Sequence, residues 1–402
     1  MLVLAVVAVA GAADPLAPKG FLDREALVAA VVAANPEVEA AQGALDAAKA
    51  RREGAGAWRD PMVDVSFAPV GIAYGMVGVS AVVSQDLPLW GVRGIAKDMA
   101  DAETDAYTAR LDAMRLDLAR MATMAWGDWY VVTRRIDLID DTVGILRAHA
   151  AATTDRLAVG KGFAQDALQA EADAQTLSIE KIDLRGERDL VQMEINTLLH
   201  RPLDTPLPPP PTAFEPTPPV PPGVPSRPEI AESAAMVHMS DGAIAMARAD
   251  RLPMIGLMAG WDAMAVPEDR LMTGLSIQVP LWARPRAAAV HDAEGRATES
   301  RAMQFAVQDR VAQDIAANER RYQAQRETVD AIGTGLVPIA RARVDAARTA
   351  FAAGMDDVRP LLDAERAFLD AEVRYEQALA DLAVRAADVD LAMGRLPGGG
   401  AP

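Results

Sequence analysis

Four short segments of the chain alternate between apolar residues and small or polar residues, which is the pattern of β-strands with one apolar face. Two of them are residues 61–70 and 77–87, and two more lie between residues 253 and 280. In the first segment the apolar set alternates with the polar set: Val63, Val65 and Phe67 against Asp64 and Ser66. Each segment has about ten residues, the length of a tilted strand that crosses a membrane. The pattern therefore predicts four strands that are wet on one face.

The hydrophobic period changes to three and four residues after Trp90, which predicts long helices that pack along a seam. The seam runs through Leu111, Met114, Leu118, Met121, Ala125, Trp129, Val132 and Ile136. No proline interrupts residues 89–201, and a similar pattern runs from Arg286 towards Phe351. A helix of about 65 residues is about 100 Å long, which no single globular domain requires. Residues 22–57 predict a further helix that ends before Asp60-Pro61, because proline disfavours helical geometry in the residue before it.

The second half of the chain repeats the first half at a distance of about 192 residues. Asn35-Pro36-Glu37-Val38 returns as Arg227-Pro228-Glu229-Ile230, and Leu87-Pro88-Leu89-Trp90 returns as Val279-Pro280-Leu281-Trp282. Further along, Gly160 matches Gly354. The repeat predicts two copies of one unit, residues 14–202 and 227–395, each with a helix, a strand hairpin and two long helices.

Three other segments flank or separate the repeats. Residues 1–13 consist of an apolar run followed by Gly11-Ala12-Ala13, which is the pattern of a secretory signal peptide and its cleavage site. The usual basic start of such a peptide is missing. The alternative interpretation is a buried N-terminal strand. Residues 203–226 are rich in proline and predict an extended linker, too poor in apolar residues to pack as a core. Residues 396–402 predict a disordered tail. No later stretch has about 18 uninterrupted apolar residues, so a membrane-spanning helix is not expected.

Composition argues against several classes of function. The formal charge of −17 disfavours a nucleic-acid partner. The chain has no cysteine, and its four histidines lack metal-binding spacing, so we predict no catalysis and no cofactor. Four methionines have the parity of the polar strand face: Met62, Met254, Met258 and Met272. Thioethers suit Cu(I), but methionine is also a flexible filler, and no metal site is predicted.

Four membrane strands cannot close a barrel, because the smallest bacterial barrels have about eight strands. An open sheet edge in lipid would leave backbone groups without hydrogen bonds. If the strands enter a membrane, the chain must therefore oligomerise, and its long helices must pack into a second cylinder. The alternative is a soluble periplasmic coiled-coil scaffold or adaptor protein, in which the strands form ordinary hairpins.

With its elements in this order, the chain resembles the TolC-like outer-membrane efflux proteins over nearly its whole length after the apolar start. Arg156-Leu157-Ala158-Val159-Gly160, followed by Asp166, is similar to the first periplasmic tip of that family. Phe351-Ala352-Ala353-Gly354, followed by Val358 to Glu365, is similar to the second tip. The paired Leu-Pro-Leu-Trp and Val-Pro-Leu-Trp elements fit the family's transition from barrel to helices. The order, duplication and spacing of these motifs carry the resemblance together.

The resemblance implies an α+β membrane channel. Three chains with four strands each would form a 12-stranded β-barrel in the outer membrane, continued by a long periplasmic α-helical barrel. Such homotrimers are passive exit ducts of tripartite efflux pumps or type I secretion systems. The implied partners are a periplasmic adaptor (membrane fusion) protein, an inner-membrane pump of RND or ABC type, and outer-membrane lipid. The exported substrate, which ranges in this family from drugs and metal ions to proteins, is not implied.

The resemblance also implies roles for particular residues. The tips that contact the adaptor correspond to Val159, Gly160, Lys161, Ala353, Gly354 and Met355. The periplasmic aperture corresponds to Asp363, with Asp356 and Asp357 as further acidic candidates, and Pro360 stands where the family often has a second acidic residue. The junctions between barrel and helices correspond to Pro88, Trp90, Pro280 and Trp282. Each group also has a purely structural interpretation. The tip glycines are then helix caps, the acidic residues favour the start of a helix, and the tryptophans pack at the junctions.

Overall fold

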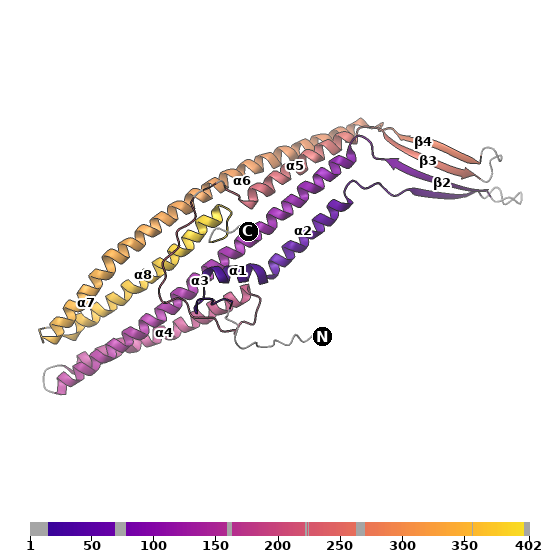
Figure 1. The fold of residues 1–402 in the computed structure, drawn as a ribbon. Helices are drawn as coiled ribbons and strands as arrows, with labels where there is room; N and C mark the ends of the chain where they lie inside the picture. Colours follow the sequence, from indigo (N-terminus) through magenta and orange to yellow (C-terminus); the bar gives the residue numbers. More distant parts are fainter. Residues whose placement is uncertain are drawn as a thin grey trace. The chain divides into compact units, whose positions relative to one another are not determined.

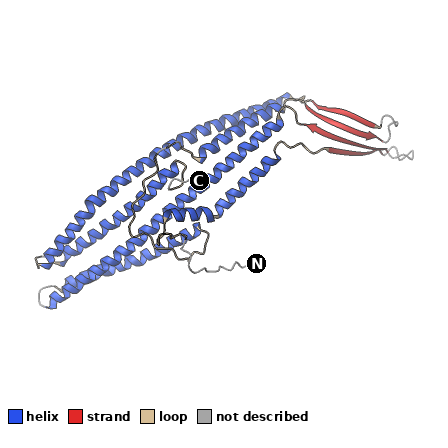
Figure 2. Ribbon diagram, in the orientation of Figure 1, coloured by secondary structure: helices blue, strands red, loops and turns tan. Residues whose placement is uncertain are grey.

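The structure, a computed structural model, describes residues 15–68, 78–158, 163–221, 223, 225–262, 270–355 and 357–397. Figure 1 and Figure 2 show that these residues form long helices and one small antiparallel sheet. The chain divides into two compact units: residues 1–39, 112–227 and 311–402 form unit 1, and residues 40–111 and 228–310 form unit 2. Each unit takes segments from both halves of the chain, so neither sequence repeat is a compact unit by itself.

Unit 2 contains the sheet, which consists of β1 (Met62–Ala68), β2 (Gly78–Leu87), β3 (Met254–Asp262) and β4 (Leu271–Gln278). The strands, which are red in Figure 2, are antiparallel. Their order in the sheet is β1-β2-β3-β4. The same unit holds most of α2 (Pro36–Gly54), all of α5 (Pro228–Ala249), and the first parts of α3 (Val92–Ala158) and α6 (Ala283–Ala331). The four strands expected from the alternating pattern are confirmed, with slightly shorter bounds.

The strand register separates an apolar face from a polar face. Val63 pairs with Val83, and Val83 pairs in turn with Ala259, so one face continues as an apolar surface across the sheet. On the other face Ser66 pairs with Ser80, and their hydroxyl oxygens lie 2.7 Å apart. The side chains of β1 are exposed on both faces in the single chain. The predicted division into two faces is therefore correct.

Unit 1 is helical. It holds α1 (Arg24–Ala34), most of α3, α4 (Ala164–Leu198), the end of α6, η3 (Ile332–Leu336), α7 (Val337–Ala352) and α8 (Val358–Ala392). α3 is a single helix of 67 residues, as the proline-free seam predicts. Within the described ranges, no helix is both long and apolar enough to cross a membrane.

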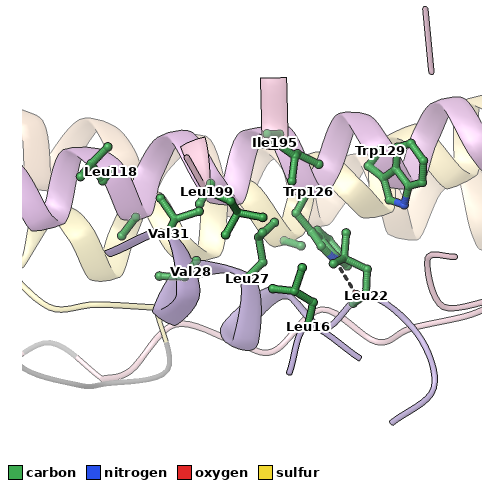
Figure 3. Packing of buried hydrophobic residues seen from close by; sticks show 14 of the residues in the cluster. Leu16, Leu22, Leu27, Val28, Val31, Leu118, Trp126, Trp129, Ile195 and Leu199 are labelled. Carbon is green, nitrogen blue, oxygen red and sulfur yellow. Dashed lines mark hydrogen bonds between the residues drawn. The ribbon is translucent and has the colours of Figure 1, made fainter. Parts of the chain in front are cut away.

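The largest core cluster of unit 1 joins α1 and the residues before it to α3 and the end of α4 (Figure 3). Leu22 and Leu27 are completely buried there. Trp126 of α3 is also buried, and its indole Nε1–H donates a hydrogen bond of 2.9 Å to the carbonyl of Leu22. Burying a tryptophan requires a partner for its one donor, which the carbonyl supplies. Apolar packing and this hydrogen bond together hold the N-terminal segment of unit 1 against α3.

The prediction of one helix over residues 22–57 is wrong, because the helix breaks at Asn35. This residue has extended backbone torsions (φ −75°, ψ 129°) between α1 and α2. The cause is Pro36, which disfavours the α-helical region for the residue before it. The Asn35 side chain stabilises the break: its Oδ1 accepts from the Glu37 N–H at 2.9 Å, and its Nδ2 donates to the Leu198 carbonyl at 3.1 Å.

The proline-rich segment is extended, but the expectation that it does not pack as a core is wrong. The Pro208 carbonyl accepts a hydrogen bond of 3.1 Å from Trp129 Nε1, and the Pro209 carbonyl accepts one of 2.8 Å from the Leu22 N–H. Phe214 packs edge-on against Trp126, with ring centroids 5.2 Å apart. Two tryptophans and one phenylalanine therefore give the segment a fixed place on unit 1.

The C-terminal segment packs against unit 1 beyond residue 395, where the second repeat was expected to end. The N–H of Arg395 donates a hydrogen bond of 3.0 Å to the Asp390 carbonyl, and Leu396 packs against the core cluster of Figure 3. The expected disordered tail therefore does not begin at Leu396, and residues 398–402 lie outside the described ranges.

The second long helical run differs from α3, because the π-helix η3 separates α6 from α7. Pro338, the second residue of α7, has no backbone N–H and cannot form the usual bond to the residue four positions earlier. The N–H of Val337 reaches back five residues to the carbonyl of Ile332, which is the π-helical pattern. The sequence predicts one continuous run here, and Pro338, near the C-terminal end of that run, explains the difference.

Candidate functional site at the helix tips and strand-to-helix junctions

The second tip is a Schellman motif that ends α7. Gly354 has a φ of +70°, and its N–H donates to the Phe351 carbonyl at 3.0 Å. The N–H of Met355 donates to the Ala350 carbonyl, also at 3.0 Å. These two bonds satisfy carbonyls that the helix end would otherwise leave unpaired. The motif leaves Met355 on the surface, where 76% of it is exposed.

The acidic candidates lie at the start of α8. Asp357 is the residue before the helix, with extended torsions (φ −73°, ψ 171°) and no side-chain bond to the helix N-terminus. Asp363 is exposed, whereas its neighbours Leu362 and Ala364 are buried. Pro360 stands in the first turn of α8, where proline breaks no helical hydrogen bond. Asp356, the third acidic candidate, lies outside the described residues.

The predicted residues of the first tip, Val159, Gly160 and Lys161, lie outside the described residues. The end of α3, which comes just before them, is described. Arg156 contacts the end of α7: its Nη2 donates to the Phe351 carbonyl at 2.6 Å, and its guanidinium lies 4.0 Å from the centre of the Phe351 ring. A hydrogen bond and a cation–π contact to one residue hold these two helix ends together. Phe163, which precedes α4, is 68% exposed.

A buried carboxylate links three helices near the second tip. Glu365 of α8 is only 3% exposed and accepts hydrogen bonds from His149 Nε2 of α3 at 3.4 Å and from Arg348 Nη2 of α7 at 3.1 Å. Burial by itself raises the pKa of this carboxyl, but the two hydrogen bonds and the charges of both partners outweigh it and lower the pKa. Glu365 is therefore held ionised and fixes α8 against its two neighbours.

Sequence reasoning did not single out this ionic group. Ala364-Glu365 repeats Ala170-Glu171, and both alanines are completely buried. The two glutamates nevertheless differ, because Glu171 is exposed whereas Glu365 is buried. The sequence contains both partners of this carboxylate, His149 and Arg348, but they are distant from each other along the chain. Only the fold brings them to one carboxylate.

The first strand-to-helix junction is held by Trp90. Its φ of +61° lies in the left-handed region, which is rare for a bulky residue, and Gly91 follows with a φ of +73°. The indole Nε1–H donates a hydrogen bond of 2.9 Å to the carbonyl of Pro253, just before β3. The junction therefore ties the end of β2 to the start of β3. Pro88 lies in the turn between β2 and α3, half-buried.

The second junction has the same sequence motif and a different environment. Trp282, between β4 and α6, is 76% exposed, compared with 50% for Trp90. Its backbone carbonyl accepts a hydrogen bond of 3.4 Å from Arg286. Pro280, like Pro88, is half-buried. All four predicted junction residues line one cavity of about 700 Å³ within unit 2, so the structure brings both copies of the motif together.

The four methionines of the strands share the polar face, as their parity predicts. Met62 and Met258 both pair with Ser84, from its two sides, and Met258 lies over Gly274. Among the described residues, no group of three or more histidine, aspartate or glutamate side chains is arranged to hold a metal ion.

The chain resembles known proteins over most of its length. The family model described as outer membrane efflux protein matches residues 27–199 and 225–395. A membrane protein from Pseudomonas aeruginosa is 17% identical, with a TM-score of 0.79 over 95% of this chain and 91% of that one. The channel CusC is 18% identical (TM-score 0.78; 95% and 93% covered), and VceC from Vibrio cholerae is 18% identical (TM-score 0.76; 94% and 97% covered). A comparison with curated protein sequences found no match.

Proposed function

The chain belongs to the outer membrane efflux protein family, and on this premise we propose that three copies form a passive exit duct for a tripartite efflux pump. Family membership confirms the predicted resemblance and fold class and places the protein in the outer membrane, extending into the periplasm. The duct itself performs no chemical step. A type I secretion system, which uses the same kind of duct, is the alternative setting.

The main support for the proposal is the sheet, which has an apolar face, a polar face and two unpaired edges among the described residues. β1 and β4 are the outer strands of the described sheet, each paired on one side only. In lipid an unpaired edge leaves backbone N–H and C=O groups without partners, at a cost of several kcal/mol each. Edge pairing among three copies removes the open edges and makes a 12-stranded barrel, with the apolar face towards lipid and the polar face towards a water-filled interior.

The helices support the same assembly, because α4 has an apolar stripe that no other described residue covers. Leu168, Ile179, Ile182 and Leu190 are 70%, 54%, 65% and 66% exposed. Helical spacing places Ile179, Ile182 and Leu190 on one side of α4. An uncovered stripe of this kind fits a helix of a neighbouring copy.

The tips are proposed as the contact with a periplasmic adaptor protein, which in turn binds an inner-membrane pump. The exposed Met355 and Phe163 support this role, since each places a large apolar side chain beside a helix reversal. The adaptor contact would involve Val159, Gly160, Lys161, Ala353, Gly354 and Met355, as the family resemblance implies. Asp363, together with Asp356 and Asp357, is proposed to line the aperture.

The direct test is the oligomeric state and conductance of the purified protein. We expect detergent-extracted protein to migrate as a trimer that heating converts to monomer, and to form ion-conducting pores in planar bilayers. Asp363→Asn should alter the cation selectivity of these pores, because a ring of three carboxylates concentrates cations in a narrow passage. Asp183→Asn, which removes the same charge from the middle of α4, is the matched control. A soluble monomer without pores would refute the duct and favour the scaffold alternative.

A further inference from the structure

The cavity at the strand-to-helix junctions has a lining that suits a ligand. Its volume of about 700 Å³ is in the range of small-molecule sites. The lining residues come from both halves of the chain and fall within four segments of unit 2: 56–59, 86–96, 247–254 and 278–289. Trp58 and Arg251 lie in these segments but are not part of the lining. Trp90 and Trp282 supply aromatic surface, and Leu87 and Leu252 supply aliphatic surface. The cavity is thus apolar over much of its wall.

Two arginines in this wall have no acidic partner among the described residues. Arg93 donates from Nε to the carbonyl of Gly56 at 2.6 Å, and Arg286 donates from Nε to the carbonyl of Asp250 at 2.9 Å. Both side chains are half-buried. Arg59, by contrast, has its charge balanced by Asp86 at 3.6 Å. Bonds through Nε fix the planes of Arg93 and Arg286. Arg286 also donates from Nη1 to the Trp282 carbonyl at 3.4 Å, which leaves its Nη2 available to a negatively charged group, as are the terminal N–H groups of Arg93.

The part of the wall that Trp90 and Arg93 form is fixed before any ligand arrives. Trp90 is held in a left-handed backbone conformation, which is unfavourable for a bulky residue and persists only where the surroundings enforce it. Its hydrogen bond to the Pro253 carbonyl fixes the ring as well. The guanidinium of Arg93 is oriented on its other side by the Trp58 ring, whose centre lies 5.4 Å away. A rigid wall of this kind loses little entropy on binding.

We propose that this cavity binds organic anions: molecules with an aromatic or aliphatic body and one carboxylate, sulfonate or phosphate group. Arg93 and Arg286 bind the anionic group through charge-assisted hydrogen bonds, and Trp90 and Trp282 contact the apolar body. Asp86, Met254 and Gln278 of the lining belong to the polar face of the sheet, so the ligand approaches from the water-filled side. That the cavity receives cargo during export rests on the proposed function; the binding itself does not.

The test compares two fluorescent probes that differ in charge. Dansylglycine has a carboxylate, and dansylamide has the same ring system without it. With full-length protein in a non-ionic detergent, we expect dansylglycine to bind at least about tenfold more tightly than dansylamide. The double variant R93Q/R286Q should lose that difference and retain the weak binding of dansylamide.

The matched control is Arg251→Gln, an exposed arginine that is close in sequence to the lining but outside it. It removes one charge from the same region and should leave dansylglycine affinity unchanged. Equal affinity for both probes, or equal losses in R251Q and in R93Q/R286Q, would overturn the site. Pore conductance of the same variants separates the two proposals: pores without selective binding refute this site alone, and binding without pores refutes the duct alone.

Discussion

At the scale of single residues, one backbone torsion explains the glycine at the second tip. Gly354 has a φ of +70°, and a methyl group at its Cα would have nothing within 4 Å, so the requirement is conformational and not steric. We expect Gly354→Ala to lower the free energy of unfolding by about 1–2 kcal/mol, measured by denaturant titration. Gly186→Ala, in open space within α4, is the control and should raise stability by about 0.5–1 kcal/mol. Equal shifts in both variants would contradict this.

Also at this scale, Glu365 makes stability depend on pH. Burial raises the pKa of its carboxyl, but the hydrogen bonds from His149 and Arg348 hold it below the ordinary value of 4.5. A carboxyl with a lowered folded-state pKa stabilises the protein above its unfolded pKa, and this contribution is lost as the pH falls through the folded pKa. We expect Glu365→Gln to lower stability by about 1–3 kcal/mol near neutral pH, because it weakens the charge-assisted hydrogen bonds that His149 and Arg348 donate to the buried carboxylate.

The measurement is the unfolding free energy as a function of pH. The parent protein should lose stability below about pH 5, and Glu365→Gln should lose less over the same interval. Asp363→Asn, which changes an exposed carboxylate two residues earlier, should stay within about 0.5 kcal/mol of the parent at every pH. An identical pH profile for the parent and Glu365→Gln would show that this carboxyl is not the acid-sensitive group.

At the scale of elements, η3 depends on a close approach between two helices. A methyl group on Gly333 would lie 2.8 Å from Cε2 of Tyr375 on α8, so the bare glycine makes room for the ring. We expect Gly333→Ala to cost about 1–3 kcal/mol of stability through overpacking. Tyr375→Leu should remove most of that extra cost in the double variant. Gly335→Ala, with open space around its Cα, is the control, and a loss equal to that of Gly333→Ala would refute the steric explanation.

The elements also show what the sequence could predict. Strand faces follow from period-two alternation, which the register confirms, because local geometry alone sets which residues share a face. The break at Asn35 and the π-helix before Pro338 follow from proline chemistry that was visible in the sequence. The packed linker did not follow, because the carbonyls of Pro208 and Pro209 find their donors, Trp129 and Leu22, only through the fold. The burial of Glu365 could not be predicted either, because its partners, His149 and Arg348, also reach it only through the fold.

At the scale of the whole molecule, the central question is what surrounds the two faces of the sheet. Val65 and Ser66 are consecutive in β1 and point to opposite faces, and both are exposed in the single chain. The chain has no cysteine, so Val65→Cys and Ser66→Cys each introduce a single thiol. In proteoliposomes we expect a sulfonated maleimide to label Ser66→Cys rapidly and Val65→Cys slowly, because thiolate formation requires contact with water.

Labelling after denaturation in sodium dodecyl sulfate provides the control, since both thiols should then react equally. In the trimeric duct Val65 faces lipid and Ser66 faces the interior, and the difference in rate disappears when the barrel unfolds. A scaffold with water on both faces of the sheet predicts equal and rapid labelling of both variants before denaturation. Equal rates in the folded protein would therefore refute the membrane position of the sheet, whereas a difference that denaturation abolishes would support it.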